Sequence, residues 1–538
     1  MPGVPPVSYP GVYVQEGESP VHAIAPVPTS VTAFIGRALR GPIDEDGPEL
    51  IHSFSDFVRI YGGLWQDSEL GYAVDDFFLN GGSDAVIVRL WKTLGTDRAS
   101  IVLSPGLELQ ARVPGSWGNL LKARIEVIDD ANVRKAVAVQ LSGFGDKVAP
   151  EDVFTLIVHD DGSKATETFA NVTLVNSPNR LDRVLAEQSQ LIRYRGADIT
   201  KLQMPPAHPA ATSNPATHLP RTIWEDPLAN TSVSNPPADD GAPLDAGVFN
   251  AGGGLGINAL DHADSFNLLV IPPYADDDSL YTEVLPQAIA YCEKRRAIVL
   301  VDPPPTWKNK DDAKKPIPGL PANANAALYF PRINKADSLR EGQVRDFAPG
   351  GAIAGTIART DRQRGVWKAP AGLEATISGV TGLTIKLTDP ENGELNPLGV
   401  NCLRTMPAAG TVIWGARTMV GDDRLASQWK YLPVRRLALF IEESLTRGTR
   451  WAVFEPNDEP LWSQLRLNLG VFMHDLFRQG AFQGQSPKDA YFVNCDGTTT
   501  TQSDIDRGIV NVIVGFAPLK PAEFVVLYIQ QIAGQLAT

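Results

Sequence analysis

The chain has 538 residues, enough for about three to four domains of ordinary size, each with a buried core. Its 62 acidic residues outnumber 48 basic ones, and the resulting net charge of -14 argues against a broad surface for binding phosphate backbones. A hydrophobic content of 43% is typical of a globular protein, whereas 47 glycines and 43 prolines predict many loops and extended segments.

The cysteines and the apolar runs limit the compartment in which this chain is expected. Cys292, Cys402 and Cys495 are odd in number and far apart, so they form neither a disulfide framework nor a paired metal or redox motif. The N-terminus lacks the basic and apolar regions of a signal peptide, and no apolar run approaches the roughly 20 residues that span a bilayer. We therefore expect a soluble protein made in a reducing compartment.

The first predicted elements are those of a layered α/β domain. A strand at Val31–Gly36 precedes a helix around Phe54–Tyr61, for which Ser55 is the expected N-cap. A second helix carries an apolar stripe from Leu70 to Phe78 and ends at the following Asn-Gly-Gly. Ala85–Leu90 then has the composition of a buried strand.

A change of pattern after this unit predicts an inserted β-rich domain. Between Ile101 and Ile199 the sequence shows short alternating runs, at Ala123–Ile128, Val137–Leu141 and Val153–Val158. Residues 204–247 are rich in Pro, Asn, Asp and Thr and show little periodicity. Because such a segment buries too little apolar surface to order itself, we expect a surface loop or linker there.

Layered α/β character returns after the linker. Strands at Phe266–Pro273 and Ala297–Pro304 enclose a helix near Ser279–Arg296, which predicts a parallel βαβ unit. The remaining predicted elements are a helix at Val434–Arg447, a strand at Trp451–Phe454, a long helix at Glu459–Gln479 and two terminal strands, Ile509–Phe516 and Glu523–Gln530.

Motifs for catalysis are weak, and we expect no enzyme activity, no cofactor and no bound metal. The seven histidines include no pair at helical spacing, and no phosphate-binding loop occurs. Gly252–Gly256 with Ala259 satisfies a dinucleotide-binding pattern, but no strand precedes it, which favours a domain junction. Asp276–Asp278 follows an apolar strand, where α/β enzymes place carboxylates. A helix N-cap at Asp278 or Ser279 is the simpler interpretation.

The two ends of the chain are the most informative segments, because both are extended and apolar. Near the C-terminus, Phe524, Val526 and Tyr528 alternate with Val525, Leu527 and Ile529, so both faces of a strand require burial. Near the N-terminus, strand-like pieces between prolines contain Val12, Tyr13, Val14, His22 and Ile24. We predict arms that add to a waiting sheet, with the alternative that each end completes its own domain.

Several segments, taken in order, resemble the contractile tail sheath family of bacteriophages and phage-like injection particles. They are Tyr9–Gly36 (YPGVYVQEGESPVHAIAPVPTSVTAFIG), Pro114–Asn119 (PGSWGN), Ala290–Pro304 (AYCEKRRAIVLVDPP), Arg435–Asn457 (RRLALFIEESLTRGTRWAVFEPN), Tyr491–Asp496 (YFVNCD) and Pro521–Gln530 (PAEFVVLYIQ). No single motif is decisive, but their common order is specific. The proline-rich 204–247 and the Lys/Pro-rich 308–318 depart from the family pattern.

The resemblance implies an α/β multidomain fold, in which N- and C-terminal parts of the chain form a layered α/β core that carries an inserted β-rich domain and extended terminal β-arms. The implied parts are an N-terminal arm (1–28), the first part of the core (29–100), the inserted domain (101–203), a Pro-rich linker (204–250), the continued core (251–360), a C-terminal sheath domain (361–520) and a C-terminal strand arm (521–538).

The resemblance also implies a structural subunit that polymerises helically around an inner tube and contracts from a metastable extended state. Its implied partners are other copies of itself, the inner tube protein, and baseplate and terminal cap proteins, with no nucleic acid and no membrane insertion. Assembly in the bacterial cytoplasm follows, with a mature location in a phage tail or injection particle. Arg466 and Arg478 are candidate tube-facing residues, and hinges are expected near Gly17–Pro20 and Pro518–Pro521. An α/β enzyme using Asp276–Asp278 and a static shell protein remain the alternatives.

Overall fold

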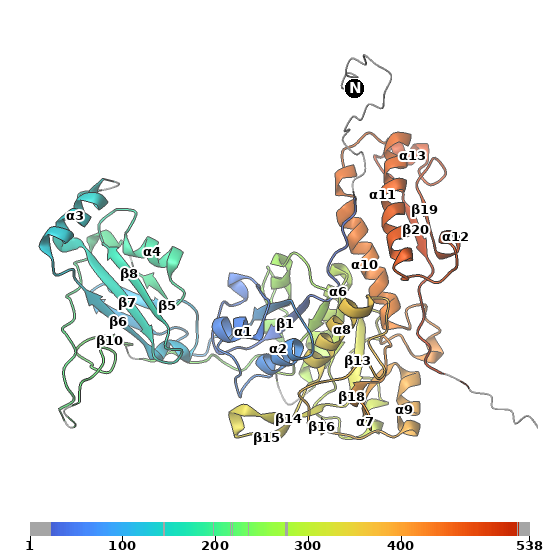
Figure 1. Ribbon diagram of the computed structural model, residues 1–538, viewed down its shortest axis with the longest axis horizontal. Helices are drawn as coiled ribbons and strands as arrows, with labels where there is room; N and C mark the ends of the chain where they lie inside the picture. The colour runs from blue at the N-terminus through green and yellow to red at the C-terminus, as the bar shows by residue number, and fades with distance from the viewer. Residues whose placement is uncertain are drawn as a thin grey trace, which may run out of the picture.

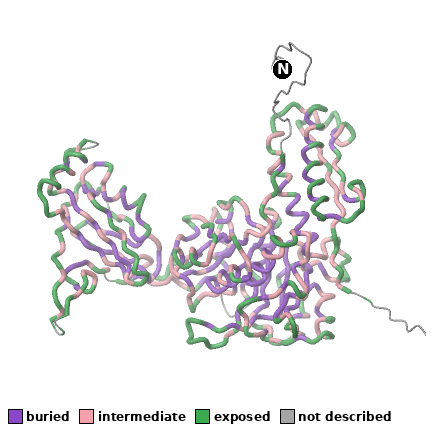
Figure 2. The backbone as a smooth tube through the Cα atoms, viewed as in Figure 1, coloured by how far each residue is buried: buried purple, intermediate pink, exposed green. Residues whose placement is uncertain are grey.

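The computed structural model describes residues 23–143, 146–196, 198–215, 217, 219–234, 236–274, 278–524 and 526. Three regions are visible in Figure 1: a central α/β core, an inserted domain connected to one side of it, and a C-terminal region built around two long helices. Buried backbone is concentrated in the core, as Figure 2 shows.

An eight-stranded sheet forms the centre of the core. Its strands follow the order β18-β17-β13-β12-β11-β1-β3-β2. They are β1 (Thr32–Gly36), β2 (Glu49–Ile51), β3 (Ala85–Arg89), β11 (Leu268–Val270), β12 (Ile298–Val301), β13 (Ala326–Phe330), β17 (Val400–Met406) and β18 (Gly410–Ile413). The six inner strands are parallel, and the edge strands β2 and β18 run antiparallel to their neighbours. Short apolar strands suit this arrangement, because inner parallel strands are covered on both faces.

Helices cover both faces of this sheet. Phe34 and Ile87 point towards α1 (Phe54–Tyr61), α2 (Leu70–Leu79) and α8 (Gly350–Arg364). The alternate residues of the same strands pack on the opposite face, against the short helices η5 (Gly256–His262), η6 (Leu280–Val284) and α6 (Leu285–Arg295). Helices α2 and α8 can approach closely because Gly351 and Gly355 of α8 lack side chains. A Cβ at either position would collide with the backbone of α2.

The predicted βαβ unit is confirmed. Strands β11 and β12 pair in parallel, and η6 and α6 connect them. The expected helix N-cap at Ser55 is wrong. The N-cap lies two residues earlier, at Ser53, whose hydroxyl accepts a hydrogen bond from the Asp56 backbone N–H.

Smaller elements complete the core. A three-stranded sheet contains β15 (Gln343–Phe347), β14 (Ile333–Asp337) and β16 (Gly382–Leu383). The remaining helices and turns of the core are α5 (Ala246–Phe249), α7 (Lys310–Ala313), α9 (Asp389–Leu395), η1 (Asp44–Asp46), η7 (Ser338–Arg340), η8 (Asn396–Leu398) and η9 (Asp423–Leu425).

The inserted domain has its own hydrophobic core, formed by two antiparallel sheets and the helix at 181–188. One sheet contains β4 (Ser100–Ser104), β5 (Leu107–Ala111) and β9 (Ile192–Arg195); the other contains β10 (Thr231–Ser232), β6 (Leu121–Glu126), β7 (Phe154–Asp160) and β8 (Thr166–Val172). The helices are α3 (Ala131–Ser142), α4 (Leu181–Gln188), η2 (Ser116–Leu120), η3 (Pro150–Asp152) and η4 (Ile199–Lys201). The strand predicted at Val137–Leu141 is wrong, because these residues lie in α3, which Asp130 caps.

The expectation that 204–247 cannot order itself is also wrong. Its strand β10 pairs with β6, and the buried Arg124 guanidinium donates to the carbonyls of Pro209 (2.8 Å) and Ala229 (2.6 Å). The Asp226 carboxylate accepts bonds from the backbone and hydroxyl of Thr212. Hydrogen bonds to buried polar groups therefore order this segment along the inserted domain, together with buried apolar residues such as Ala229 and Ala238.

Two adjacent stretches of chain form a neck between the core and the inserted domain. The backbone N–H groups of Asp239 and Ala242 donate to the carbonyls of Thr96 and Lys92. At the core end of the neck, the buried Arg89 guanidinium donates to the carbonyls of Ala38, Gly41 and Pro114 at 2.7 to 2.9 Å. The hydrogen bonds of the buried Arg89 thus tie the neck to the core.

The C-terminal region is helical, with a small sheet at its side. It contains α10 (Leu432–Gly448), η10 (Arg450–Ala452), α11 (Glu459–Arg478), α12 (Pro487–Ala490), β19 (Tyr491–Asn494), α13 (Gln502–Asp506) and β20 (Ile513–Phe516). The strand predicted at Trp451–Phe454 is wrong: a 3-10 turn occupies its start, and Phe454 is exposed with a positive φ of 72°. The boundary at 361 is wrong too, since β17 and β18 belong to the core sheet.

These observations confirm a mixed α/β multidomain fold with several sheets and helices. The terminal strand arms lie outside the described residues, apart from a few positions at their roots.

Candidate assembly site

The two strands at the side of the C-terminal region form a short antiparallel ribbon. Residues Tyr491 and Val493 of β19 lie opposite Phe516 and Val514 of β20. These four side chains face the cluster formed by α10 and α11, which stabilises the ribbon on one side. Among the described residues each strand pairs only with the other, so each presents one free edge. A two-stranded ribbon is marginal alone, and its free edges suit the addition of further strands.

The outer face of the ribbon is apolar at two positions. Phe492 and Ile513 each have half of their side-chain surface exposed. Gly515 lies opposite Phe492, and a Cβ there would collide with the Phe492 ring. Exposed large side chains beside open edges are typical of a docking surface.

The N-terminal segment from residue 23 lies along α10. The Ile24 side chain is buried against Gly448 at the end of α10. The Val27 N–H donates to the Ser444 hydroxyl at 3.2 Å. This segment therefore runs antiparallel to the helix and reaches its C-terminal end.

A buried ion pair holds the start of this segment. The Arg436 guanidinium makes two bonds to the Asp361 carboxylate, at 2.8 and 2.6 Å, and both side chains are almost fully buried. The same guanidinium donates to the Thr29 carbonyl at 2.9 Å, and the Thr29 hydroxyl donates to Asp361 at 2.7 Å. We call this set of three residues the N-terminal clamp.

A second buried arginine holds the C-terminal segment. The Arg417 side chain is fully buried, and its Nε and Nη2 atoms donate to the Glu523 carboxylate at 2.7 and 2.5 Å. Its Nη1 donates to Asp423 and to the Gly421 carbonyl, both at 3.0 Å. We call Arg417, Glu523 and Asp423 the C-terminal clamp.

The charges of the C-terminal clamp stabilise one another. Burial by itself would lower the pKa of Arg417, but the carboxylates of Glu523 and Asp423 raise it above its ordinary value. The Lys430 ammonium, followed by Arg417, holds the pKa of Asp423 below its ordinary value. Arg417 and Asp423 are therefore both charged at neutral pH.

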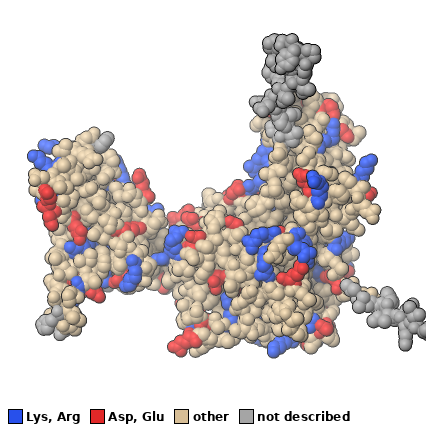
Figure 3. Space-filling model, viewed as in Figure 1, with Lys and Arg blue, Asp and Glu red and all other residues tan. Residues whose placement is uncertain are grey.

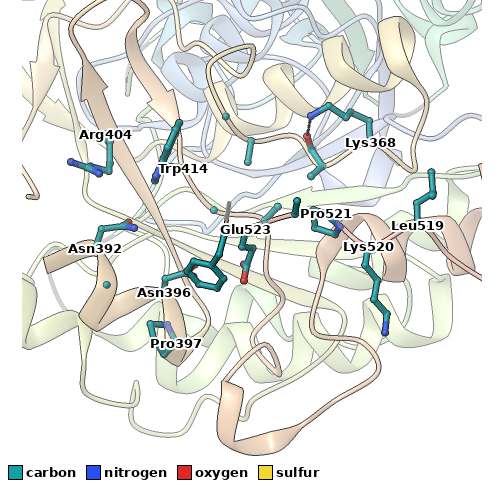
Figure 4. A pocket seen from close by; sticks show the side chains of 18 of the residues that line it. Lys368, Asn392, Asn396, Pro397, Arg404, Trp414, Leu519, Lys520, Pro521 and Glu523 are labelled. Carbon is teal, nitrogen blue, oxygen red and sulfur yellow. Dashed lines mark hydrogen bonds between the residues drawn. The ribbon is translucent and has the colours of Figure 1, made fainter. Parts of the chain in front are cut away.

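A cavity of about 940 Å³ opens beside the C-terminal clamp. Figure 4 shows Arg404 and Trp414 on one side of it and Leu519 and Lys520 on the other, with Glu523 between them. The chain leaves the body here: Phe524 and Val526, beyond the clamp, are 76% and 68% exposed.

The structure places the predicted arm residues unevenly. Phe524 and Val526 project from the body, as expected of an arm. Ile24 instead packs inside its own chain, so its assignment to an exchanged arm is wrong. The other predicted arm residues lie outside the described residues: Val12, Tyr13, Val14, His22, Val525, Leu527, Tyr528 and Ile529. The hinge expected at Pro518–Pro521 lies between a bridge from Phe482 to Pro518 and the clamped Glu523.

The two candidate tube-facing arginines differ in their surroundings. Arg466 donates to the Glu459 carboxylate at 2.5 Å and to the Cys495 carbonyl, so its charge is engaged within the chain. Arg478 is exposed at the end of α11 and forms no ion pair among the described residues. On the face shown in Figure 3, basic and acidic side chains are interspersed over the core and the C-terminal region.

The residues considered for an enzyme do not converge on a site. Asp276 and Asp277 lie outside the described residues, and Asp278 accepts a hydrogen bond from the Thr306 hydroxyl. The glycine-rich segment precedes a 3-10 helix, and the Gly256 N–H donates to Asp44 at 2.9 Å. Within the described ranges there is no group of three or more potential metal-ligating side chains, and no helix is long and apolar enough to span a bilayer.

Sequence reasoning missed the arginines that fix the two segments. The only available signal was the position of Arg436 in the apolar pattern of α10, where a charge requires a buried partner. Arg417 and Glu523 are too far apart in sequence for any local pattern to connect them.

Comparison with known protein families identifies two adjoining domains. Residues 251–419 match the phage tail sheath protein central domain, and residues 426–532 match the phage tail sheath C-terminal domain. Together these matches cover just over half of the chain.

Two tail sheath proteins are similar in sequence. That of Vibrio phage KVP40 is 24% identical over 327 residues, which are 54% of this chain and 47% of the relative. That of Enterobacteria phage T4 is 28% identical over 171 residues, which are 32% of this chain and 24% of the relative. The chain thus spans less than half the length of these relatives.

Solved sheath structures are similar over nearly the whole chain. The sheath of the PVC extracellular contractile injection system in its contracted state covers 98% of this chain and 99% of its own, with a TM-score of 0.54 and 22% identity. The contracted helical sheath of the anti-feeding prophage has the same coverage, a TM-score of 0.55 and 21% identity. A sheath tail protein of Listeria innocua covers 91% and 96%, with a TM-score of 0.58 and 12% identity. At these identities the likeness establishes a shared fold.

Proposed function

The chain belongs to the phage tail sheath family, and we propose that it is the structural subunit of a contractile sheath that polymerises helically around an inner tube. The observation that carries this proposal is the ribbon of β19 and β20, which has two free edges among the described residues and an apolar outer face. In the sheath, these edges accept strands from the arms of neighbouring subunits.

The arms supply the matching chemistry. The C-terminal arm begins at Phe524, alternates apolar residues on both faces and is too apolar to remain in water. Ordering an arm costs conformational entropy that offsets most of the gain from burying it, so a single arm binds weakly. Several arms that meet preformed ribbons make assembly cooperative. Because each contact joins different surfaces of two copies, the polymer is open and helical.

Contraction moves the folded bodies while the arms keep them connected. The extended sheath is metastable, and a barrier holds it until the baseplate releases the first ring. The sheath then drives the inner tube through a target envelope, and a terminal cap closes the other end. Energy comes from protein contacts, so the stroke needs no nucleotide. Arg478 is the better candidate for contact with the tube, because Arg466 is engaged within the chain.

Removal of the arm tests this function. A variant ending at Glu523 keeps the C-terminal clamp and the ribbon but lacks residues 524–538. It is expected to remain folded, with the thermal melting of the full chain, and to form no cylinders in electron micrographs. A matched variant keeps the full length but carries Phe524→Ser and Val526→Ser, and it is expected to polymerise poorly. Normal cylinders from the shortened chain would refute strand exchange by the C-terminal arm.

A further inference from the structure

The two segments that leave the subunit are held at opposite ends of one helix. At the start of α10, the stretch that contains Arg417 pairs with the residues just before the helix: Leu432 N–H donates to the Ala416 carbonyl, and Thr418 N–H to that of Lys430. At the other end, Ile24 packs on Gly448, the last residue of α10. The C-terminal segment therefore leaves beside the first turn of α10, and the N-terminal segment leaves beside the last.

The length of α10 sets the distance between these two points. A helix of 17 residues is about 25 Å long at a rise of 1.5 Å per residue.

Helix α10 has no internal point of bending. Its proline lies in the first turn and its glycine is the last residue, so the interior contains neither. One face packs on the core through Leu432 and Leu439, and another packs on α11 through Leu437, Phe440 and Ile441. The helix is thus a rigid part of both regions.

The C-terminal clamp resists pulling on the arm. Arg417 has no exposed surface, so loss of Glu523 would leave a buried guanidinium with Asp423 as its one carboxylate among the described residues. A buried charge that loses its partner is strongly destabilising. The clamp therefore holds Glu523 in place while Phe524 and the residues beyond it move.

We propose that α10 is a spacer of fixed length between the two arms, with Arg417 fixing the C-terminal root beside its first turn and Ile24 and Val27 fixing the N-terminal root beside its last turns. This inference rests on the proposed exchange of arms between subunits. In the sheath, displacement of one neighbour then passes through α10 to the next with no slack between Ile24 and Glu523. The joint of the C-terminal arm then lies after Glu523, not at the predicted hinge at Pro518–Pro521.

A distance measurement in assembled sheath tests the spacer. Spin labels are placed at Ala25→Cys and Ala522→Cys, both at exposed positions beside the two arm roots, in the full-length chain. The native cysteines are buried, so the introduced thiols react selectively. Labelled chains are diluted into unlabelled ones, so that electron-electron resonance reports distances within one subunit. We expect a single narrow distribution, and E523Q is expected to broaden it at least two-fold.

E69Q is the matched control. Glu69 binds the buried Arg332 at 2.7 Å, with a similarly small exposure, but lies far from the arms in α2's N-terminal turn. We expect E69Q to leave the distribution narrow, and R417K, which keeps the charge but loses the paired bonds, to broaden it partially. The spacer proposal would be wrong if the distance distribution stayed narrow in both E523Q and R417K, or if it were broad in the chain without these substitutions.

Polymerisation separates this inference from the proposed function. E523Q is expected to raise the critical concentration for cylinder formation at least five-fold over E69Q. If the chain ending at Glu523 fails to polymerise while E523Q behaves as E69Q does, the spacer is wrong and strand exchange stands. If the shortened chain polymerises normally, strand exchange itself is wrong.

Discussion

The N-terminal and C-terminal segments are fixed to the same helix by different chemistry. Residues 23–30 follow α10 for its whole length and combine apolar packing by Ile24 with hydrogen bonds from Val27 and Thr29. The ion pair that supports them, Arg436 with Asp361, lies entirely within the folded body. In the C-terminal clamp, by contrast, Arg417 pairs with Glu523, and Glu523 belongs to the segment that leaves the folded body.

Residues 23–30 are therefore part of the folded body, whereas the C-terminal segment is attached to that body through the side chain of Glu523. Movement of the N-terminal arm leaves the Arg436–Asp361 pair intact, so the N-terminal root is stable whatever the arm does. Release of the C-terminal root would break a buried charge pair. The two roots can be distinguished by variants of the residues that hold them.

The largest expected effect is that of R436M. It leaves Asp361 buried without its charged partner, and the free energy of unfolding should fall by about 3 to 5 kcal/mol. R417M should cost less, because Asp423 is 46% exposed and can be hydrated. Urea unfolding of both variants measures the difference, and equal losses would contradict the contrast between the roots.

The second expected effect is that the stability of the core, which carries both clamps, depends on pH. Burial raises the pKa of Asp302 to about 7, and burial opposed by Lys335 raises that of Asp76 to about 6. The folded state therefore binds more protons than the unfolded state between about pH 4 and these values, and acidification stabilises it.

The expected gain from Asp302 is about 2 to 4 kcal/mol between pH 8 and 4, at 1.36 kcal/mol per pKa unit. D302N should remove that part of the dependence, as urea unfolding at several pH values would show. The C-terminal clamp should not share this gain, since Asp423 has a lowered pKa and stays charged over most of this range. A loss of stability on acidification would contradict the assignment.

A third effect tests whether the N-terminal root belongs to the fold. I24A removes a buried side chain at the end of α10, and the free energy of unfolding should fall by about 2 kcal/mol. The same truncation at Val526, which is exposed, should change the free subunit by less than about 0.5 kcal/mol. Thermal melting of the two variants provides the measurement.

The smallest expected effect is that of Y431F. The Tyr431 hydroxyl donates to Glu523 at 3.4 Å, a long bond beside the two short ones from Arg417. Its loss should change unfolding and polymerisation by less than about 0.5 kcal/mol. An effect as large as that of E523Q would show that Arg417 is not the main partner of Glu523.

Long, regular elements of the fold could be predicted from the sequence. The apolar stripes of α2, α10 and α11 recur at helical spacing over many turns, and the buried strands β1, β3 and β12 are continuous apolar runs. Short elements were ambiguous. In α3, alternation over Val137–Leu141 suggests a strand, although Val139 is exposed on a helix.

The order of 204–247 and both clamps could not be predicted, for a shared physical reason. Each depends on a buried arginine that is satisfied by groups distant in sequence: Arg124 by the carbonyls of Pro209 and Ala229, and Arg417 by Glu523. Hydrophobic periodicity contains no information about such pairs. The apolar alternation that predicts the C-terminal arm is local, so it can be recognised in the sequence, and Phe524 and Val526 are exposed in the folded chain.

The neck at Thr96 and Asp239 has a consequence for engineering. The two stretches of chain in the neck enter and leave the inserted domain side by side, and that domain has a separate hydrophobic core. A foreign domain with adjacent termini could replace residues 97–238, and the bond from the Ala242 N–H to the Lys92 carbonyl would still join the two stretches of the neck. In the sheath that we propose, each subunit would then carry one copy of the chosen cargo.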